Sequence, residues 1–253
     1  MDIMSLSIII ITKNEENQIQ DCLESARFAD EIILVDSGST DRTLDIAKSY
    51  VTQIIETEWK GFSGTKNIAL EAATGDWIFW LDADERIPTE LQNEICEIMQ
   101  NGTHEGYYVA RKAIFLGRWI KHCGWFPGYV IRLFKAKGAQ FSDDQVHESV
   151  EIDGPTSHFN TPLIHYTDLS IEHYLLKFNH YTTLGARQLF ESNRMFHLTD
   201  LIGRPMFSFI KMYVLKLGFL DGIQGLILCV LSACYVFTKY AKLWLLWHQD
   251  NVK

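Results

Sequence analysis

The first 85 residues alternate short apolar runs with longer polar stretches, and this alternation constrains the fold more than any other feature. The runs are rich in β-branched residues at consecutive positions, as in strands buried on both faces. The predicted strands cover residues 6–11, 31–35, 51–56 and 77–81, and the predicted helices cover 15–28, 41–50 and 64–73. Strands that alternate with helices predict βαβ units and a doubly wound, mainly parallel sheet of the α/β class.

The chain changes character after this region. A helix is predicted at 88–100, directly after a proline, and strands at 107–115 and 129–134 enclose an aromatic-rich loop. From Ser170 onward the sequence has long helical stretches rich in Tyr, Phe and Leu. We therefore predict a catalytic domain over 1–169, with halves 1–100 and 101–169, and a helical extension over 170–253.

Composition excludes several protein classes. With 47% apolar residues, the 253-residue chain can bury a full core, which argues against disorder. The five cysteines are odd in number and lack paired spacing, which argues against a disulfide scaffold and favours a reducing compartment. The N-terminus has no basic segment and only a short apolar run, so a strand is expected there rather than a signal peptide.

Charge is distributed unevenly along the chain. The net charge of −9 argues against nucleic-acid binding. Residues 1–100 carry 7 Lys+Arg against 20 Asp+Glu, whereas residues 101–253 carry 16 against 12. An acidic first half is thus joined to a mildly basic second half.

Polar residues follow three of the predicted strands. The first strand is followed by Thr12-Lys-Asn-Glu15, the second by Asp36-Ser-Gly-Ser-Thr-Asp41 and the fourth by Asp82-Ala-Asp-Glu85. Ligands of open α/β sheets bind beyond the carboxyl ends of the strands. We therefore expect a site at this edge, with a cation or hydrogen-bond donors that offset the clustered carboxylates.

Asp82 and Asp84 form the sharpest motif. Two carboxylates separated by one residue on an extended segment project to the same side, and hard oxygen ligands of this kind suit Mg²⁺ or Mn²⁺. The segment 37–39 either bends around a ligand or forms an ordinary turn with Ser39 or Thr40 as a helix N-cap. The glycine patterns of Rossmann sites and P-loops do not occur in the sequence.

Several motifs together resemble one enzyme family. They are Ser-Ile-Ile-Ile-Ile-Thr-Lys-Asn-Glu-Glu near the N-terminus, Val35-Asp-Ser-Gly-Ser-Thr-Asp41, Lys66-Asn67 and Leu81-Asp-Ala-Asp-Glu85. In this order and spacing they resemble family 2 glycosyltransferases of the GT-A fold. Downstream segments resemble the bacterial branch that adds glucose to the lipopolysaccharide inner core: Gly124-Trp125, Arg132-Leu-Phe134, Val146-His-Glu148 and Lys216-Leu-Gly-Phe-Leu-Asp-Gly222.

The resemblance implies roles for individual residues. Thr12, Asn14 and Glu15 would line the base and ribose of a nucleotide sugar, and Asp36 would hydrogen-bond uracil. Lys66 matches a basic residue that contacts base or phosphate. Asp82 would approach the ribose, and Asp84 would contact a divalent cation, Mg²⁺ or Mn²⁺, bridging the pyrophosphate.

Inverting transfer also needs a base to accept the proton of the acceptor hydroxyl. The candidates are Asp143, Asp144 and Glu148; we favour Glu148, with Asp144 second. His147 is a candidate ligand of the metal or phosphates, with an ordinary loop histidine as the alternative.

Other candidates have a structural alternative as well. His165 is expected to be a buried structural histidine, and Arg132 is expected either to bind an anion or to form a surface ion pair. Trp119, Trp125 and Phe126 either stack on an acceptor sugar or belong to the core.

The C-terminal third suggests contact with a membrane. Residues 222–238 form an uncharged run at the lower length limit for a membrane span, with basic residues and tryptophans beside it. We favour a buried or interfacial helix that docks on the anionic cytoplasmic leaflet. A helical dimerisation segment is the alternative.

The combined prediction is an inverting, metal-dependent glycosyltransferase at the cytoplasmic face of the inner membrane. It would transfer glucose from a UDP-sugar to a lipid-anchored acceptor, a heptose of the lipopolysaccharide inner core, with a β linkage. The alternatives are transfer to a polyprenyl phosphate or another cell-surface glycan, and a non-catalytic nucleotide-sugar-binding scaffold.

Overall fold

The computed structural model describes residues 4–142 and 150–250 and divides into two compact units. Unit 1 comprises Met1–Arg111 and Gly128–His165, and unit 2 comprises Lys112–Pro127 and Tyr166–Lys253. This division falls close to the boundary predicted after residue 169. It differs in the aromatic-rich loop, which clusters with the C-terminal helices rather than with the acceptor-side half.

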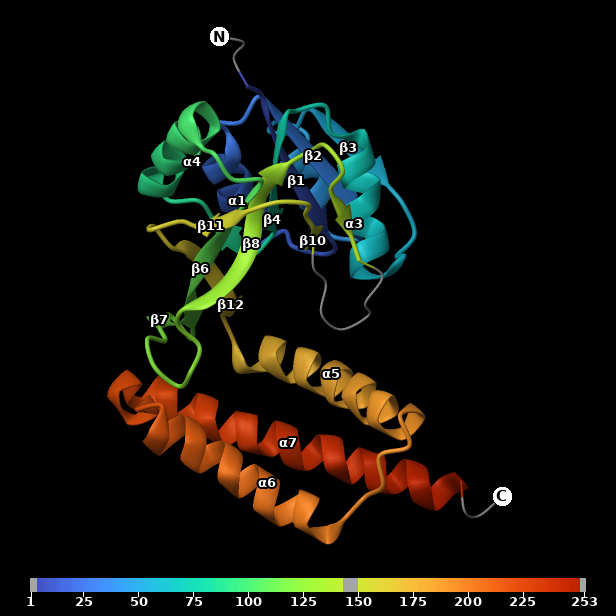
Figure 1. Cartoon of the computed structure of the whole chain (residues 1–253). Helices are drawn as coiled ribbons and strands as arrows, with labels where there is room; N and C mark the ends of the chain where they lie inside the picture. The colour runs from blue at the N-terminus through green and yellow to red at the C-terminus, as the bar shows by residue number, and fades with distance from the viewer. Residues whose placement is uncertain (1–3, 143–149, 251–253) are drawn as a thin grey trace. The chain divides into compact units, whose positions relative to one another are not determined.

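The first part of unit 1 has the predicted alternation of strands and helices (Figure 1). Its elements are β1 (Leu6–Thr12), α1 (Ile19–Ala26), β2 (Glu31–Asp36), α2 (Thr43–Ala47), β3 (Gln53–Glu56), α3 (Gly61–Ala72), β4 (Trp77–Asp82), β5 (Glu85–Arg86) and α4 (Thr89–Asn101). All four predicted strands and the helix after Pro88 are confirmed.

Further strands complete the sheet. They are β6 (Gly106–Phe115), β7 (Arg118–Trp119), β8 (Gly128–Lys135), β11 (Thr156–His158) and β12 (Leu163–Asp168), while β9 (Gln140–Phe141) and β10 (Val150–Glu151) pair separately. The strand order is β3-β2-β1-β4-β8-β6-β12-β5, and β7 and β11 also pair with β6. Strands β1 to β4 are parallel, whereas β8 is antiparallel to both β4 and β6.

The alternation of side chains along the strands builds two core layers. Ile8 and Ile10 of β1 belong to the cluster that includes Leu23 of α1 and helix α4. Ile9, which points to the opposite face, belongs to the cluster with Ala69 of α3. Helices α1, α2 and α4 therefore cover one face of the sheet and α3 covers the other (Figure 1).

Unit 2 is mainly helical. Its helices are α5 (Ile171–Glu191), α6 (Leu198–Ile210), which continues as the π-helical segment Lys211–Leu215, a short 3-10 helix (Gly218–Asp221) and α7 (Gly222–Asp250). Helix α7 packs against both α5 and α6. Leu228 and Leu243 of α7 are fully buried, and the Lys242 amine donates to Asn179 and Thr182 of α5.

Close packing explains Gly218 and Gly225, which lie on either side of the start of α7. A Cβ on Gly218 would lie 2.8 Å from Cys123 Sγ, and a Cβ on Gly225 would lie 2.2 Å from the carbonyl oxygen of Gly218. Asp221, nearly inaccessible to solvent, accepts hydrogen bonds from the backbone N–H groups of Lys121 and His122. The segment 216–222 thus joins the start of α7 to the aromatic-rich loop.

Candidate active site

The order of the strands reverses between β1 and β4. The chain runs outward through β1, β2 and β3 and returns through α3 to β4, on the other side of β1. Such a reversal of strand order is where open α/β sheets bind ligands, beyond the carboxyl ends of the strands. Thr12 ends β1 and Asp82 ends β4, so the sequence-predicted residues lie at this edge.

Hydrogen bonds tie together the loops that follow β1 and β2. The backbone N–H of Asn14 donates to Ser39 Oγ at 2.8 Å, and the N–H of Thr40 donates to Asn14 Oδ1 at 2.7 Å. The N–H of Glu15 donates to Thr43 Oγ1 at 2.8 Å. Asn14 has a φ of 55°, a conformation that asparagine tolerates better than most residues. The two loops therefore form one framework.

Helix α2 begins later than predicted. Asp41 Oδ1 accepts from the N–H and the hydroxyl of Thr43, at 3.0 and 2.5 Å, and the helix starts at Thr43. The expectation that Ser39 or Thr40 caps this helix is therefore wrong, because their side chains bond to the loops instead.

Asp36 is buried and held by its own loop. Asp36 Oδ2 accepts from the N–H groups of Gly38 and Ser39 at 2.9 and 2.8 Å, and Oδ1 accepts from Ser39 Oγ at 2.5 Å. Since a carboxylate oxygen accepts two hydrogen bonds, Oδ1 retains one acceptor position. The carboxylate thus shapes the turn and still has capacity for one ligand donor.

Two buried hydroxyl groups at this edge are unsatisfied. Among residues 4–142 and 150–250, Thr12 Oγ1 and Ser37 Oγ have no hydrogen-bond partner. Buried polar groups are normally paired with protein or water. These two hydroxyls therefore point to a polar ligand beyond the ends of β1 and β2.

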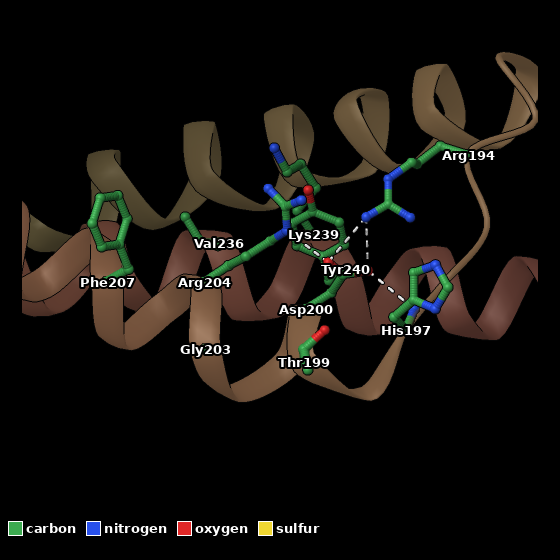
Figure 2. A pocket seen from close by; sticks show the side chains of 10 residues that line it. All are labelled: Arg194, His197, Thr199, Asp200, Gly203, Arg204, Phe207, Val236, Lys239 and Tyr240. Atoms are coloured by element: carbon green, nitrogen blue, oxygen red, sulfur yellow. Dashed lines mark hydrogen bonds and ion pairs between the residues drawn. The ribbon is translucent and has the colours of Figure 1, made fainter.

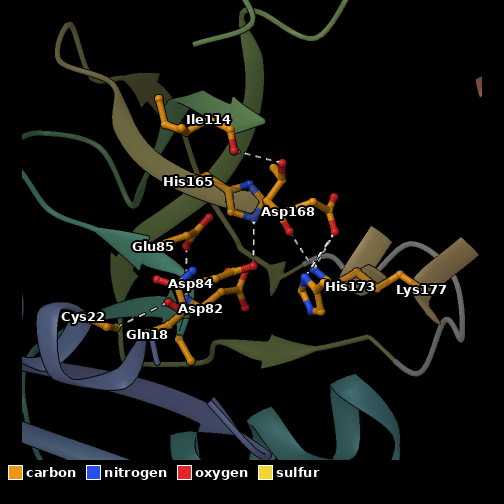
Figure 3. Close-up of polar contacts among 12 residues, drawn as sticks. Gln18, Cys22, Asp82, Asp84, Glu85, Ile114, His165, Asp168, His173 and Lys177 are labelled. Atoms are coloured by element: carbon orange, nitrogen blue, oxygen red, sulfur yellow. Dashed lines mark hydrogen bonds and ion pairs between the residues drawn. The ribbon is translucent and has the colours of Figure 1, made fainter. Parts of the chain in front are cut away.

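Asp82 ends β4, Glu85 begins β5, and Asp84 lies in the two-residue turn between these strands, so the two aspartates do not share one extended segment as we expected. Glu85 folds back and accepts from the N–H of Asp82 at 3.1 Å. Figure 3 shows the three carboxylates gathered near His165. The turn separates the two aspartates, so each has its own partner.

Arg132 is the partner of Asp82. Its Nη2 donates to Asp82 Oδ2 at 2.8 Å and to Glu85 Oε1 at 2.5 Å, and its side chain is fully buried. Arg132 lies inside strand β8, which pairs with β4. Of the two alternatives for Arg132, the surface ion pair is wrong, because Arg132 is a buried cation that pairs with the carboxylates of the acidic turn. Its Nε and Nη1 have no hydrogen-bond partner among the described residues.

The charges in this cluster set the protonation states. Burial raises the pKa of Asp82, but the charges of Arg132 and Lys66 outweigh it and hold the pKa well below its ordinary value. Burial raises the pKa of Glu85, Arg132 opposes this, and the charge of Asp82 adds to the rise, which leaves the pKa above its ordinary value. Asp82 is thus the carboxylate that stays ionised most readily.

Trp80 of β4 belongs to the site, although no sequence pattern indicated this role. Lys66 Nζ lies 3.5 Å from the centroid of its ring and Arg132 Cζ lies 3.3 Å from it. Two cations this close to one centroid must lie on opposite faces. The sequence pattern places Trp80 only within a buried strand, but its ring holds both cations of the site by cation–π attraction.

His165 is mostly buried, as expected, and it also contacts the acidic turn. It pairs with Glu85 across β12 and β5, and its Nε2 lies 3.3 Å from Asp84 Oδ2. Both side chains are less than one fifth exposed. Burial lowers the pKa of His165, but the hydrogen bond and charge of Asp84 outweigh it and raise the pKa. His165 therefore belongs to the site.

Asp84 and the neutral form of His165 offer one oxygen and one nitrogen donor to a cation. Within the part of the chain that the structure describes, no three His, Cys, Asp or Glu side chains form a metal-binding group. A divalent cation in a nucleotide site takes its other ligands from phosphates and water. The donor set of this pair therefore fits a divalent cation.

The predicted base and second metal ligand lie outside the described residues. These are Asp143, Asp144, His147 and Glu148. Their assignments stay predictions.

The aromatic residues of the loop 117–127 belong to unit 2. Trp119 packs against Phe126 and lies close to two amines, with Lys112 Nζ at 4.8 Å and Lys121 Nζ at 4.5 Å from its ring centroid. Trp125 packs against Phe115 beside the helical core. Trp125 is thus largely a packing residue, whereas Trp119 is part of a basic aromatic cluster.

Comparisons with known proteins show the family. A family model described as glycosyl transferase family 2 matches residues 7–151. The lipopolysaccharide core biosynthesis glycosyltransferase LpsC of Rhizobium meliloti (strain 1021) is 32% identical over 95% of this chain and 92% of that protein. A glycosyltransferase of Rickettsia typhi is 31% identical over 94% of this chain and 86% of that protein.

Solved structures share the architecture. The crystal structure of S. aureus TarS 1–349 in complex with UDP has a TM-score of 0.51 and 16% identity, covering 94% of this chain and 92% of that chain. At this identity the likeness shows the fold alone, and it confirms the predicted GT-A architecture.

Proposed function

Because the chain belongs to glycosyl transferase family 2, we propose that it transfers glucose from UDP-glucose to a heptose of the lipopolysaccharide inner core. Transfer proceeds with inversion and forms a β linkage. The observation that carries the proposal is the acidic turn at the β1/β4 edge, where Arg132 fixes Asp82 and His165 pairs with Asp84. The similarity to LpsC supports the class of acceptor.

The donor occupies the framework of the two loops in this proposal. Uracil hydrogen-bonds to the remaining acceptor position of Asp36, and the ribose lies against Asp82. Thr12, Asn14 and Glu15 line the base and ribose, and the unsatisfied hydroxyls of Thr12 and Ser37 find their partners in the ligand. Lys66, whose charge helps to lower the pKa of Asp82, supplies a positive charge that contacts the base or a phosphate.

Asp84 and His165 would hold a divalent cation, Mg²⁺ or Mn²⁺, with His147 as a further candidate ligand. When bound, the cation offsets the negative charge of the departing diphosphate. Arg132 orients Asp82, and Asp84 orients His165 through their hydrogen bond.

The reaction is an in-line displacement at the anomeric carbon. Glu148 accepts the proton of the acceptor hydroxyl as the new bond to the anomeric carbon forms and UDP leaves. Asp144 is the second candidate for this role. Because the base acts only on the acceptor, its loss affects turnover much more than it affects UDP binding.

The base assignment has its own test. We expect Glu148→Gln to lower turnover by about 100- to 10,000-fold with little change in UDP affinity. Asp144→Asn, the matched variant, should have a much smaller effect. A large loss in Asp144→Asn with near-normal turnover in Glu148→Gln would transfer the role to Asp144.

Transfer itself is tested with purified protein, Mn²⁺ and radiolabelled donor. UDP-glucose and UDP-galactose are compared, with lipopolysaccharide truncated to its heptose region and a polyprenyl phosphate as acceptors. The proposal predicts labelled product with UDP-glucose and the heptose-terminated acceptor. Product on polyprenyl phosphate alone would overturn the acceptor, and product with UDP-galactose alone would overturn the donor sugar.

The acceptor is lipid-anchored, so we place the enzyme at the cytoplasmic face of the inner membrane as a peripheral protein. One helix supports membrane contact by length and composition: the segment Gly218–Gln249 is apolar enough to cross a bilayer. Helix α7 buries Leu228 and Leu243 and bonds to α5 through Lys242, which favours a packed helix over a free span.

A further inference from the structure

The outer side of α6 is apolar. Ile202, Met206 and Ile210 follow one another at intervals of four residues and are 64%, 59% and 42% exposed. Leu201 and Pro205, on the other side of the helix, are partly covered. A helix that faces water carries polar residues on its outer side. Helix α6 carries large apolar residues on its outer side as well as on its packed side, where Leu201 contacts the core, so water is an unsuitable medium for the outer side.

This apolar outer side continues beyond α6. Between residues 198 and 223, eleven large apolar side chains are exposed: Leu198, Ile202, Met206, Phe207, Ile210, Val214, Leu215, Leu217, Phe219, Leu220 and Ile223. Soluble monomers rarely expose so many large apolar groups within one segment, and such surfaces mark contact with a membrane or a partner.

A basic cavity adjoins this surface (Figure 2). It has a volume of about 500 Å³ and is lined by Arg194, Arg204 and Lys239 together with Asp200 and Phe207. Phe207 is 61% exposed and also belongs to the apolar outer side of α6. The cavity and the apolar surface are therefore continuous.

The cavity holds more positive charge than its own carboxylate offsets. Asp200 accepts from Arg194 Nη2 at 3.2 Å, from Arg204 Nε at 2.6 Å and from the N–H of His197 at 3.0 Å. Lys239 Nζ lies 5.3 Å from the ring centroid of Tyr240, and burial and the charge of Arg204 lower its pKa. A bound anion would offset this excess charge.

Unit 2 as a whole is basic. It carries 12 Lys+Arg against 6 Asp+Glu, whereas unit 1 carries 11 against 26. An anionic membrane surface attracts basic segments beside it, and an interfacial helix buries its apolar side at the boundary of headgroups and acyl chains. A protein partner would not require this combination of excess positive charge and apolar side chains.

We propose that the cavity lined by Arg194, Arg204 and Lys239 binds the phosphate of an anionic phospholipid headgroup while the outer side of α6 enters the bilayer interface. Phe207 lies where the headgroup meets the acyl chains. The proposal deepens the membrane contact in the proposed function, but it assigns that contact to α6 and a defined anion site rather than to α7.

The test is co-sedimentation of the full chain with vesicles of phosphatidylcholine, alone and mixed with phosphatidylglycerol. We expect strong binding only to the anionic vesicles. Lys239→Gln should weaken it about fivefold, the effect expected for one basic residue near an anionic surface, and Lys239→Arg should retain it. The matched control is Arg187→Gln, which removes an exposed positive charge on α5 and should weaken vesicle binding less.

The apolar contribution is tested separately. Met206→Gln should weaken vesicle binding, whereas Leu176→Gln, which changes a leucine that is 73% exposed on α5, should not. Substitutions on the surface are used because removal of α7 would expose the core of unit 2. UDP affinity is measured in every variant, and it should be unchanged, so that a failure here is separable from a failure of the donor site.

Four results would overturn the proposal. The first is equal binding to neutral and anionic vesicles, and the second is equal losses in Lys239→Gln and Arg187→Gln. The third is calorimetric binding of inorganic phosphate without any vesicle binding, which would identify a site for free phosphate. The fourth is a dimer in light scattering that Met206→Gln converts to a monomer without a change in vesicle binding, which would assign the surface to a second copy.

Discussion

At the scale of single residues, the site depends on one buried cation. Arg132 contacts Asp82 and Glu85 and stacks on Trp80, and its side chain has no exposure to solvent. A buried charge is tolerable only when it is paired, and the loss of one member leaves the others uncompensated. The geometry of the acidic turn therefore follows from Arg132 more than from the carboxylates themselves.

Arg132→Met should destabilise the protein by about 3–5 kcal/mol, because it leaves the buried Glu85 and the partly exposed Asp82 without their cation. Urea unfolding measures this loss. The double variant Arg132→Met/Glu85→Gln should recover part of it, since one unpaired carboxylate is removed. Equal stability of the single variant and the wild type would contradict the role of Arg132 as the brace of the turn.

At the scale of secondary-structure elements, the strands were predictable and the partners of the site residues were not. Consecutive β-branched residues identify β1 and β2, and Pro88 marks the start of α4, because these signals are local. The pairing of Arg132 with Asp82, or of His165 with Asp84, depends on strands brought together from distant parts of the chain. No local sequence pattern specifies the positions that β8 and β12 take in the sheet.

Helix α6 gives a prediction at this scale. Asp200 accepts from the N–H of His197 at the helix start and from two arginines, and its side chain is 3% exposed. Burial raises the pKa of Asp200, but the bonds from Arg204 and His197 outweigh it, so the folded-state pKa is lowered. The resulting stability is present above the unfolded pKa, about 4, and is lost as the pH falls through the lower folded pKa.

Asp200→Asn should therefore cost about 1–3 kcal/mol at neutral pH and flatten the fall in stability below about pH 4. Chemical unfolding between neutral and acidic pH measures both effects. Asp45→Asn, which removes an exposed carboxylate from α2, is the control. The prediction fails if the two variants have the same pH profile.

At the scale of the whole molecule, charge separates the two units. Unit 1 has an excess of 15 acidic residues and contains the candidate site, whereas unit 2 has an excess of 6 basic residues and contains the apolar outer side of α6. An acidic unit is repelled by an anionic bilayer, and a basic unit is attracted. The charge distribution therefore favours membrane contact through unit 2.

Binding to anionic vesicles should consequently weaken several-fold when the salt concentration rises from about 0.1 M to about 1 M, because the screening length falls from about 10 Å to about 3 Å. Burial of the apolar side chains of α6 should leave residual binding at high salt. Co-sedimentation across this range measures both parts. Binding that is independent of salt would contradict the electrostatic contribution.

The most direct test of the central claim is calorimetric titration of UDP into the purified protein, with and without Mn²⁺. Wild type and the exposed-site control Asp45→Asn should bind UDP with an affinity that Mn²⁺ increases. Asp84→Asn and His165→Ala should lose this Mn²⁺ dependence and bind at least about tenfold more weakly in its presence. The absence of UDP binding by the wild type under either condition, or undiminished Mn²⁺-dependent binding by Asp84→Asn, would contradict the account.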